Sequence, residues 1–366
     1  MSGPAQLAGS RFVVSLLAVS LLAASPAGCG TDPAPFTARG WDEADRLFRT
    51  ESDFLGADAA YSVPLAPGRT LFLFGDTFVA TSPARVRSES RMVRNTVGIV
   101  EGADPSTATF TPILPCDPDG VPQSFFAERG DAWLWPMHGA RIEGGPLILF
   151  LSRVVSDPGG LGFRADGAVA VAIDDPDADP IQWTPRDLAL PDPPFPLLFG
   201  VATLIEGEHL YVYAVREPGN HDIYLVRYPL ADARRGDLAA PEWWVEGERF
   251  GDVEAGALRV MDDGATELSV SAHDGRFVAV QTRGFGGTTI ATRSAPRPEG
   301  PWTALVDAYR PPESDRDGVI VYAAKAHPEL SGADLVVTYA ANDLDFASLV
   351  ADASLYFPRF VRLDAR

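Results

Sequence analysis

One pattern recurs five times along the chain and constrains its fold more than any other feature of the sequence. Each copy has a short strand, a tight turn that contains glycine, and a strongly apolar strand that ends in a small or polar residue. The turn glycines of the five copies are Gly68, Gly145, Gly207, Gly264 and Gly332, at intervals of 77, 62, 57 and 68 residues. Such an interval holds about four short strands with their loops, which is one blade of a β-propeller.

The repeat therefore predicts an all-β fold, a five-bladed β-propeller that occupies residues 42–366. The composition agrees, because 34 glycines, 32 prolines and 10% aromatic residues suit many turns and short strands. A β-sandwich is the alternative, but it would not explain a repeat of this length. Helical periodicity is visible only between Asp42 and Phe48.

Residues 1–28 have the features of a signal peptide. A single arginine precedes the apolar run Phe12–Ala24, which is too short to span a bilayer. Small residues then lead to Cys29 and resemble the lipobox of bacterial lipoproteins, although Pro26 stands where an aliphatic residue is usual. We expect Cys29 to carry a lipid and residues 29–41 to form a tether. The exported protein would then be anchored in the cell envelope, at the outer membrane or the cell surface. Secretion without a lipid is the alternative, and labelling with a fatty-acid analogue, with Cys29→Ala as the control, separates the two.

The net charge of −20 narrows the range of partners. Phosphate backbones and anionic membranes repel such a surface, so we expect no nucleic-acid partner and membrane contact only through the lipid on Cys29. A neutral ligand is compatible with this charge, and we expect a monomer. If Cys29 carries a lipid, Cys116 has no intramolecular partner, because the chain has only two cysteines.

Two carboxylates in the first copy of the repeat suggest a catalytic site. Asp58 stands near the start of the first strand, and Asp76 follows the apolar strand, 18 residues later. In a propeller the first strand of every blade lines the central channel, where side chains from distant parts of the sequence converge. A pair of carboxylates is the minimum for glycoside hydrolysis, one as the acid and the other as the base or nucleophile. Alternatively, both aspartates only cap turns.

Further candidates for ligand contacts stand at the starts of other copies or at strand ends: Trp135, His138, Glu254, Lys325, His327, Asn95 and Asn342. Trp135 could stack on a sugar face, and His138 could bind a hydroxyl group. Glu254 could be a third carboxylate, because it has the same offset from its turn glycine as Asp58. Lys325 is the only lysine beside 29 arginines, which suggests that an ammonium group is needed there. Each of these residues could instead have a structural role. The five histidines lack metal-binding spacing, and we expect no metal or cofactor.

These residues resemble a known family of glycan-cleaving propellers. The similarity to domain-of-unknown-function family 4185 is carried by Asp58–Ser62, Gly68–Thr77, Ala326–Leu330, Val336–Tyr339 and Asn342. That family includes the endo-D-arabinanases of glycoside hydrolase family 183, and the similarity extends over most of residues 42–364. The resemblance implies a five-bladed propeller that cuts furanoside linkages in arabinan, with the two essential aspartates at Asp58 and Asp76.

Three classes of function are compatible with these observations. The first is a glycoside hydrolase that acts on a furanose-containing polysaccharide through Asp58 and Asp76. The second is a non-catalytic propeller that binds carbohydrate or protein at the cell envelope, and the third is a structural lipoprotein. Catalysis requires both aspartates to face one pocket in the channel with Lys325 or His138 within reach, so their geometry discriminates between the classes.

Overall fold

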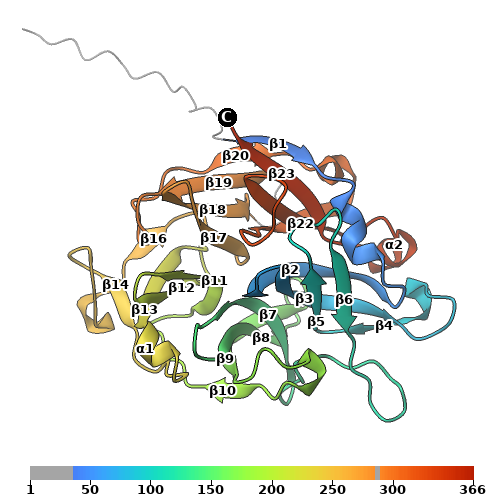
Figure 1. Cartoon of the computed structure of the whole chain (residues 1–366), viewed down its shortest axis with the longest axis horizontal. Coiled ribbons are helices and arrows are strands. Elements are labelled where there is room, and N and C mark those ends of the chain that lie inside the picture. Colours follow the sequence, from blue (N-terminus) through green and yellow to red (C-terminus); the bar gives the residue numbers. More distant parts are fainter. Residues whose placement is uncertain (1–35, 285–288) are drawn as a thin grey trace, which may run out of the picture. The chain divides into compact units, whose positions relative to one another are not determined.

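The computed structural model describes residues 36–284 and 289–366. The predicted signal peptide, Cys29 and the first part of the expected tether lie outside the described residues. The described chain forms five antiparallel sheets arranged in a ring around a common centre (Figure 1). The prediction of a five-bladed β-propeller is therefore confirmed. No helix among the described residues is both long and apolar enough to cross a membrane.

Each sheet is one blade. The first contains β2 (Phe54–Ala66), β3 (Arg69–Ala80), β4 (Ser90–Val93), β5 (Thr96–Glu101) and β6 (Thr109–Ile113). The second contains β7 (Ala132–Arg141), β8 (Leu147–Ser156), β9 (Phe163–Ile173) and β10 (Arg186–Leu188). The third contains β11 (Leu198–Glu206), β12 (His209–Val215), β13 (Ile223–Pro229), β14 (Glu242–Val245), β15 (Arg249–Gly251) and β16 (Arg259–Met261).

The fourth blade contains β17 (Leu268–His273), β18 (Arg276–Thr282), β19 (Ile290–Ala295) and β20 (Val306–Tyr309). The fifth contains β21 (Val319–Ala326), β22 (Leu335–Asp343), β23 (Arg359–Ala365) and β1 (Phe36–Gly40). The connections include the short helices α1 (Leu230–Ala233) and α2 (Phe346–Ala351) and the 3-10 helices η1 (Ala44–Arg49), η2 (Arg87–Glu89), η3 (Pro180–Gln182), η4 (Val253–Ala255) and η5 (Pro312–Asp315).

The innermost strands are β2, β7, β11, β17 and β21, and they contact one another in this cyclic order. Blades pack face to face, so the inner part of each sheet is buried on both sides. The run Leu147–Leu151 in β8, for example, is completely buried. This packing explains why the repeat shows continuous apolar runs where a half-exposed strand would alternate polar and apolar residues.

The turn predicted for the fourth copy is wrong. The expected turn at Gly264 precedes the innermost strand β17, and the hairpin turn itself lies at Asp274–Gly275. Both turn residues have positive φ, 46° and 72°, as a two-residue hairpin turn requires. Gly264 has another role, because a Cβ there would lie 2.5 Å from the carbonyl oxygen of His221. The close approach of two chain segments, and not a hairpin, needs glycine at this position.

The ring is closed by pairing the two ends of the described chain. β1 pairs with β23 over five residues, from Phe36 opposite Ala365 to Gly40 opposite Val361. Figure 1 shows the blue β1 beside the red β23. Residues 36–40, which we expected in the tether, are therefore part of the fifth blade. The helical periodicity after them corresponds to the short 3-10 helix η1.

Candidate active site

Asp58 lies near the start of β2, where the strand departs from regular pairing. The register between β2 and β3 shifts on either side of Ala59, and Ala59 and Ala60 have φ values of 64° and 61°. Left-handed φ at two successive non-glycine residues is strained, and such strain clusters at functional sites. The irregular backbone brings Asp58 against the next strand near Gly75 and Asp76. A Cβ on Gly75 would lie 2.3 Å from Oδ1 of Asp58.

The carboxyl group of Asp58 holds its proton unusually tightly. Burial, together with the negative charges of Asp76 and Glu267, raises its pKa to about 7. The hydroxyl of Tyr322 donates to Oδ2 of Asp58 at 2.6 Å, and Tyr356 also hydrogen-bonds this carboxyl group. These two bonds favour the charged form and limit the increase. At neutral pH a large fraction of the Asp58 carboxyl groups is therefore protonated.

Asp76, in β3, is held by two side chains. Nε1 of Trp135 donates to Oδ1 at 2.9 Å, and Nη1 of Arg94 lies 3.4 Å from Oδ2. Burial raises the pKa of Asp76, whereas the bonds from Trp135 and Arg94 lower it. The guanidinium of Arg94 lies 4.4 Å above the ring of Trp133, which fixes its position. The side chain of Asp76 keeps 17% exposure, so solvent and small ligands reach it.

Glu267 is a third carboxylate beside Asp58, and the sequence analysis did not identify it. It immediately precedes β17, its side chain is 25% exposed, and it forms an ion pair with Nζ of Lys325. Lys325 is buried; its Nζ also donates to the carbonyl of Ala323 at 2.9 Å and lies 4.2 Å above the ring of Tyr61. Burial lowers the pKa of Lys325, and the charge of Glu267 opposes this effect. The only lysine of the chain is therefore the counter-charge of a channel carboxylate.

Glu254, the residue proposed as the third carboxylate, lies elsewhere. It is exposed on η4, which follows the outer strands of the third blade. The error follows from the misplaced turn, because two Asp-Gly pairs, Asp263-Gly264 and Asp274-Gly275, lie close together in the fourth copy and the offset was counted from the first. Glu267 lies eight residues before the true turn glycine Gly275, directly ahead of the innermost strand, and is the carboxylate of this copy. A strand on both sides of the Asp-Gly pair was the signal that could have found it.

Tyr322 reaches Asp58 because β21 is also irregular. The register between β21 and β22 shifts between Tyr322 and Lys325, and Ala323 has a φ of 60°. Nδ2 of Asn342 lies 3.4 Å from the hydroxyl oxygen of Tyr322, so this predicted residue is adjacent to the site. Its Oδ1 is buried and has no hydrogen-bond partner among the described residues. Asn342 therefore offers an unused acceptor beside the carboxylates.

Tyr356 comes from the segment that connects β22 to β23. Its φ is 61°, and its backbone N–H donates to the carbonyl of Ala341 at 2.9 Å. Its own carbonyl packs against Gly56, where a Cβ would lie 2.4 Å away. Gly56 has a φ of 129°, so both the conformation and the close approach require glycine there.

The two predicted histidines are committed to contacts within the protein. Nε2 of His138 lies 3.0 Å from the carbonyl oxygen of Ser62, and its Nδ1 accepts from the N–H of Thr203 at 2.9 Å. Nδ1 of His327 lies 2.6 Å from Oγ of Ser62, and Nε2 lies 2.7 Å from Oγ1 of Thr338. Burial lowers the pKa of His138 to about 4 and that of His327 to about 3. Both rings are neutral at neutral pH and join neighbouring strands.

Asn95 is also structural. Its Nδ2 donates to the carbonyls of Phe126 and Leu134, and its Oδ1 accepts from the N–H of Phe126. Trp135 is half-buried, donates to Asp76 and packs edge to face on Phe163 at 4.7 Å. Its observed role is to position Asp76, and the stacking of Trp135 on a sugar remains a prediction.

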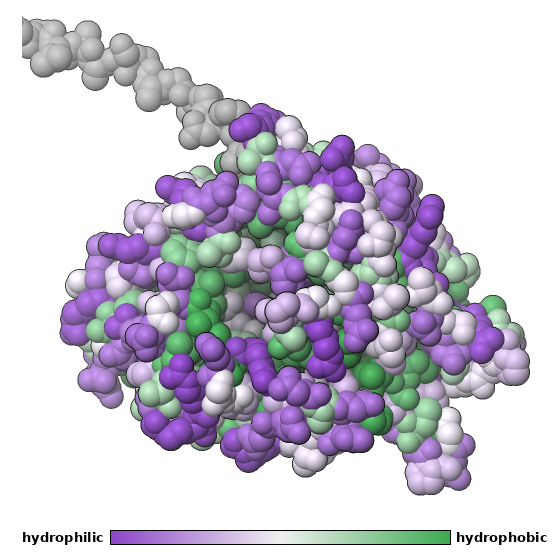
Figure 2. Space-filling model, viewed as in Figure 1, coloured by the Kyte–Doolittle hydropathy of each residue, from purple (hydrophilic) through white to green (hydrophobic). Residues whose placement is uncertain are grey.

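The site as a whole brings three carboxyl groups together in the central channel. Asp58, Asp76 and Glu267 are all partly exposed, and Arg94 and Lys325 balance part of their charge. Figure 2 shows that one face of the ring is hollowed near its centre. Across residues 36–284 and 289–366, no group of three or more His, Cys, Asp or Glu is placed to hold a metal ion. The arrangement is suited to acid–base chemistry on a bound molecule.

The fold and the carboxylates define a five-bladed β-propeller with an acidic site in its channel. The chain belongs to the family described as domain of unknown function DUF5005, whose model matches residues 42–365. The assignment to family 4185 is therefore wrong. Its motifs were an aspartate at an innermost strand and an apolar strand that ends in Gly75-Asp76, which propeller packing can produce in more than one family. Comparison with curated proteins finds no match.

Solved structures share this fold. A protein from Bacteroides ovatus ATCC 8483 that carries the provisional name of a hydrolase is 17% identical, with a TM-score of 0.70 over 89% of this chain and 90% of that chain. The catalytic domain of a GH62 α-L-arabinofuranosidase from Coprinopsis cinerea is 12% identical, with a TM-score of 0.50 over 90% of this chain and 97% of that chain. Structural neighbours of the chain thus include five-bladed glycoside hydrolases at low identity. Such identities demonstrate the fold alone.

Proposed function

We propose that the protein is a glycoside hydrolase that acts on a furanose-containing polysaccharide. The observation that carries the proposal is the position of Asp58, whose carboxyl group lies beside Asp76 and Glu267 and has its pKa raised to about 7. A carboxylic acid that keeps its proton at neutral pH next to an ionised carboxylate is the pair that glycoside cleavage needs. The fold that the chain shares with an arabinofuranosidase supports a furanose as the sugar.

The proposed roles follow from the surroundings of each group. Asp58 donates its proton to the glycosidic oxygen as the bond from that oxygen to the anomeric carbon breaks. Asp76, whose pKa the bonds from Trp135 and Arg94 lower against the larger effect of burial, either takes a proton from the attacking water or attacks the anomeric carbon itself. The ion pair with Lys325 holds Glu267 in the channel near Asp58. The negative charge of Glu267 raises the pKa of Asp58 and so keeps the proton on Asp58 until it is transferred. The configuration of the released sugar, observed by NMR, distinguishes inversion from retention.

Separate substitutions of the two aspartates test this proposal. Asp58→Asn and Asp76→Asn should each lower the release of reducing ends from arabinan or arabinoxylan by about 10² to 10⁴-fold, because each removes a proton-transfer or nucleophilic group. The exposed Asp192 provides the matched control, Asp192→Asn, which should keep full activity. Full activity in either site variant would remove the role of that residue. Binding of glycans without any new reducing ends would replace hydrolysis with a carbohydrate-binding function.

A further inference from the structure

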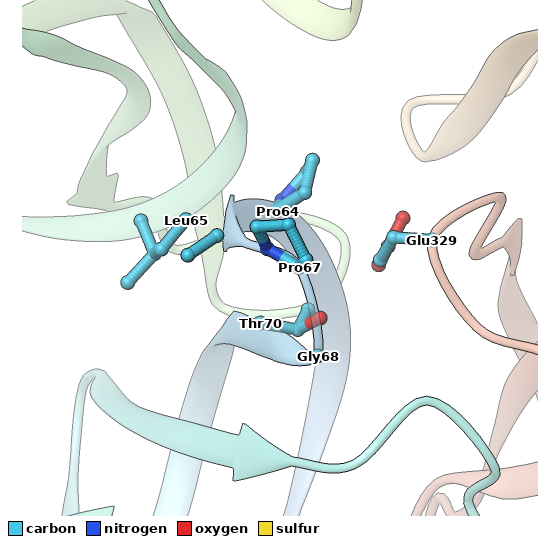
Figure 3. Close-up of a pocket in the computed structure, with 7 residues that line it drawn as sticks. Pro64, Leu65, Pro67, Gly68, Thr70 and Glu329 are labelled. Carbon is cyan, nitrogen blue, oxygen red and sulfur yellow. The ribbon is translucent and has the colours of Figure 1, made fainter.

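A second pocket lies away from the proposed active site. It is a cavity of about 310 Å³ formed by the turn between β2 and β3 and by the chain that follows β21, and its lining includes Pro64, Leu65, Pro67, Thr70 and Glu329 (Figure 3). The volume is at the lower end of the range for small-molecule sites. Pro64 and Leu65 lie at the C-terminal end of β2, and Pro67 lies in the turn after it, whereas Asp58 lies near the start of β2. The pocket is therefore separate from the carboxylates that we assign to catalysis.

Glu329 gives this pocket its chemical character. Figure 3 shows its carboxyl group directed toward the side of Pro67 and Thr70. Oε1 of Glu329 is buried and has no hydrogen-bond partner among the described residues. The hydroxyl of Ser62 bonds the carboxyl group, but burial dominates and raises the pKa of Glu329 to about 7. None of the described residues that line the pocket is lysine, arginine or histidine, so the carboxyl group faces the cavity without a counter-charge.

A carboxylate that lines an apolar cavity without a counter-charge is unfavourable, and a cationic ligand that donates to it offsets this penalty. A metal ion does not fit, because calcium and magnesium need several oxygen ligands and the pocket supplies one carboxylate. A primary ammonium fits better, since it supplies both the positive charge and the hydrogen. Pro64, Leu65 and Pro67 offer apolar surface for the carbon atoms next to that ammonium. The protein's net charge of −20 also raises the local concentration of cations.

We propose that this pocket is a binding site for a small organic ligand with a primary ammonium group, which pairs with Glu329. The ammonium forms an ion pair and a hydrogen bond with the carboxylate of Glu329, and the aliphatic part of the ligand lies on the two prolines. Binding requires the ionised carboxylate, so the protonated fraction of Glu329 loses its proton to solvent when the ligand binds near neutral pH.

Isothermal titration calorimetry with n-butylammonium chloride tests this site. The protein should bind the amine saturably, whereas n-butanol, which has the same carbon chain without the charge, should bind at least about tenfold more weakly. At pH 7 the binding enthalpy should change with the ionisation enthalpy of the buffer, because a proton is released. Absence of saturable amine binding, or equal binding of n-butanol, would overturn the proposal.

Two substitutions locate the binding. Glu329→Gln should weaken the amine by about tenfold or more and remove the buffer dependence. The matched control is Glu208→Gln, at an exposed position in the equivalent turn of the third blade, and it should bind as the unaltered protein does. If Glu329→Gln does not fold, Glu329→Asp keeps the charge and withdraws it from the ligand, and weaker binding is again expected. Unchanged binding in a folded Glu329 variant would refute the assignment. Asp58→Asn should leave amine binding intact, so this result is independent of the proposed catalysis.

Discussion

At the scale of single residues, the proton on Asp58 connects the proposed chemistry with the stability of the fold. Its pKa is about 7 in the folded protein and 3.8 in an ordinary setting, so the folded state binds this proton more tightly than the unfolded chain does. The associated stability is fully present below about pH 4 and is lost as the pH rises through 7. Glu329, with its pKa raised to about 7, acts in the same direction. The buried His138 and His327 act in the opposite direction, because their lowered pKa values reduce stability as the pH falls below about 6.5.

Asp58→Asn should therefore stabilise the protein at alkaline pH. Asparagine cannot ionise, so the variant avoids the cost of a buried charge. The free energy of unfolding of the variant minus that of the unaltered protein should be about 2 to 3 kcal/mol larger at pH 8 than at pH 5. Urea unfolding at the two pH values measures this difference. A difference that does not change with pH would show that Asp58 titrates normally.

Lys325 should be needed for stability only while Glu267 is present. Lys325→Met leaves Glu267 without a counter-charge in the channel and should lower the free energy of unfolding by about 3 kcal/mol. The double variant Lys325→Met, Glu267→Gln removes both charges and should regain more than half of this loss. Urea unfolding of the two single variants and the double variant gives the coupling energy. If the losses of stability in the two single variants simply add up in the double variant, the ion pair with Glu267 does not explain why the chain has a lysine at position 325.

At the scale of elements, irregular strands position the site. β2, β7, β11 and β21 all have register shifts in their pairing with the next strand, and β17 has none. A bulge turns a side chain away from the regular alternation of the strand. This is how Asp58 and Tyr322 come to meet. The repeated strands thus form the propeller, and the irregular positions within these strands bring the side chains of the site together.

The segment that carries Tyr356 is fastened by one buried arginine. Arg87, in η2, is 6% exposed and donates to the carbonyl oxygens of Leu55, Leu349, Asp352 and Leu355. Its guanidinium also lies 5.2 Å from the ring centre of Phe78. Arg87 therefore connects the first blade to the segment after α2, which holds Tyr356 against Asp58.

Arg87→Met should loosen this segment. The substitution leaves several carbonyls without donors and should lower the free energy of unfolding by about 3 kcal/mol. Hydrogen exchange of residues 346–357 should increase more than exchange elsewhere. The control is Arg85→Met, because Arg85 is exposed and pairs only with exposed Asp53, so its loss should change stability by less than about 0.5 kcal/mol. Equal effects of the two variants would refute the fastening role.

At the scale of the whole molecule, the ring depends on a strand from the other end of the chain. β1 completes the fifth blade beside β23, and Phe36 is buried against it. Without β1, the edge of β23 would be exposed in the last blade. Closure of this kind joins the first and last parts of the described chain in one blade and so helps to keep the ring closed.

A variant without residues 36–40 should be less stable by about 3 kcal/mol, because it loses the burial of Phe36 and a ladder of hydrogen bonds. It should also associate more readily, since an exposed strand edge can pair with another molecule. Thermal unfolding and light scattering measure the two effects. Phe36→Ala, which keeps the backbone pairing, should show the loss of stability without the association. An unaltered melting temperature after the deletion would show that closure does not depend on β1.

The sequence alone determined the architecture, because each blade repeats the same local physics of apolar strand and glycine turn. It also singled out Asp58, Asp76 and Lys325, since charged residues next to strongly apolar strands stand out in a sequence. It misplaced the fourth turn, because Asp263-Gly264 and Asp274-Gly275 have the same local turn propensity, and only the apolar strands on both sides of the second pair distinguish it.

Only the tertiary structure decided which side chains meet. Glu267 and Tyr322 reach Asp58 from other blades, and Tyr356 reaches it from a connecting segment, across separations that no local pattern encodes. The same packing turned His138 and His327 into neutral links between strands, because both of their nitrogens found partners in the closed ring. Strand composition is a local property that the sequence carries directly. The pKa of a carboxyl group depends on burial and neighbouring charge, and both arise only when the five blades close around the channel.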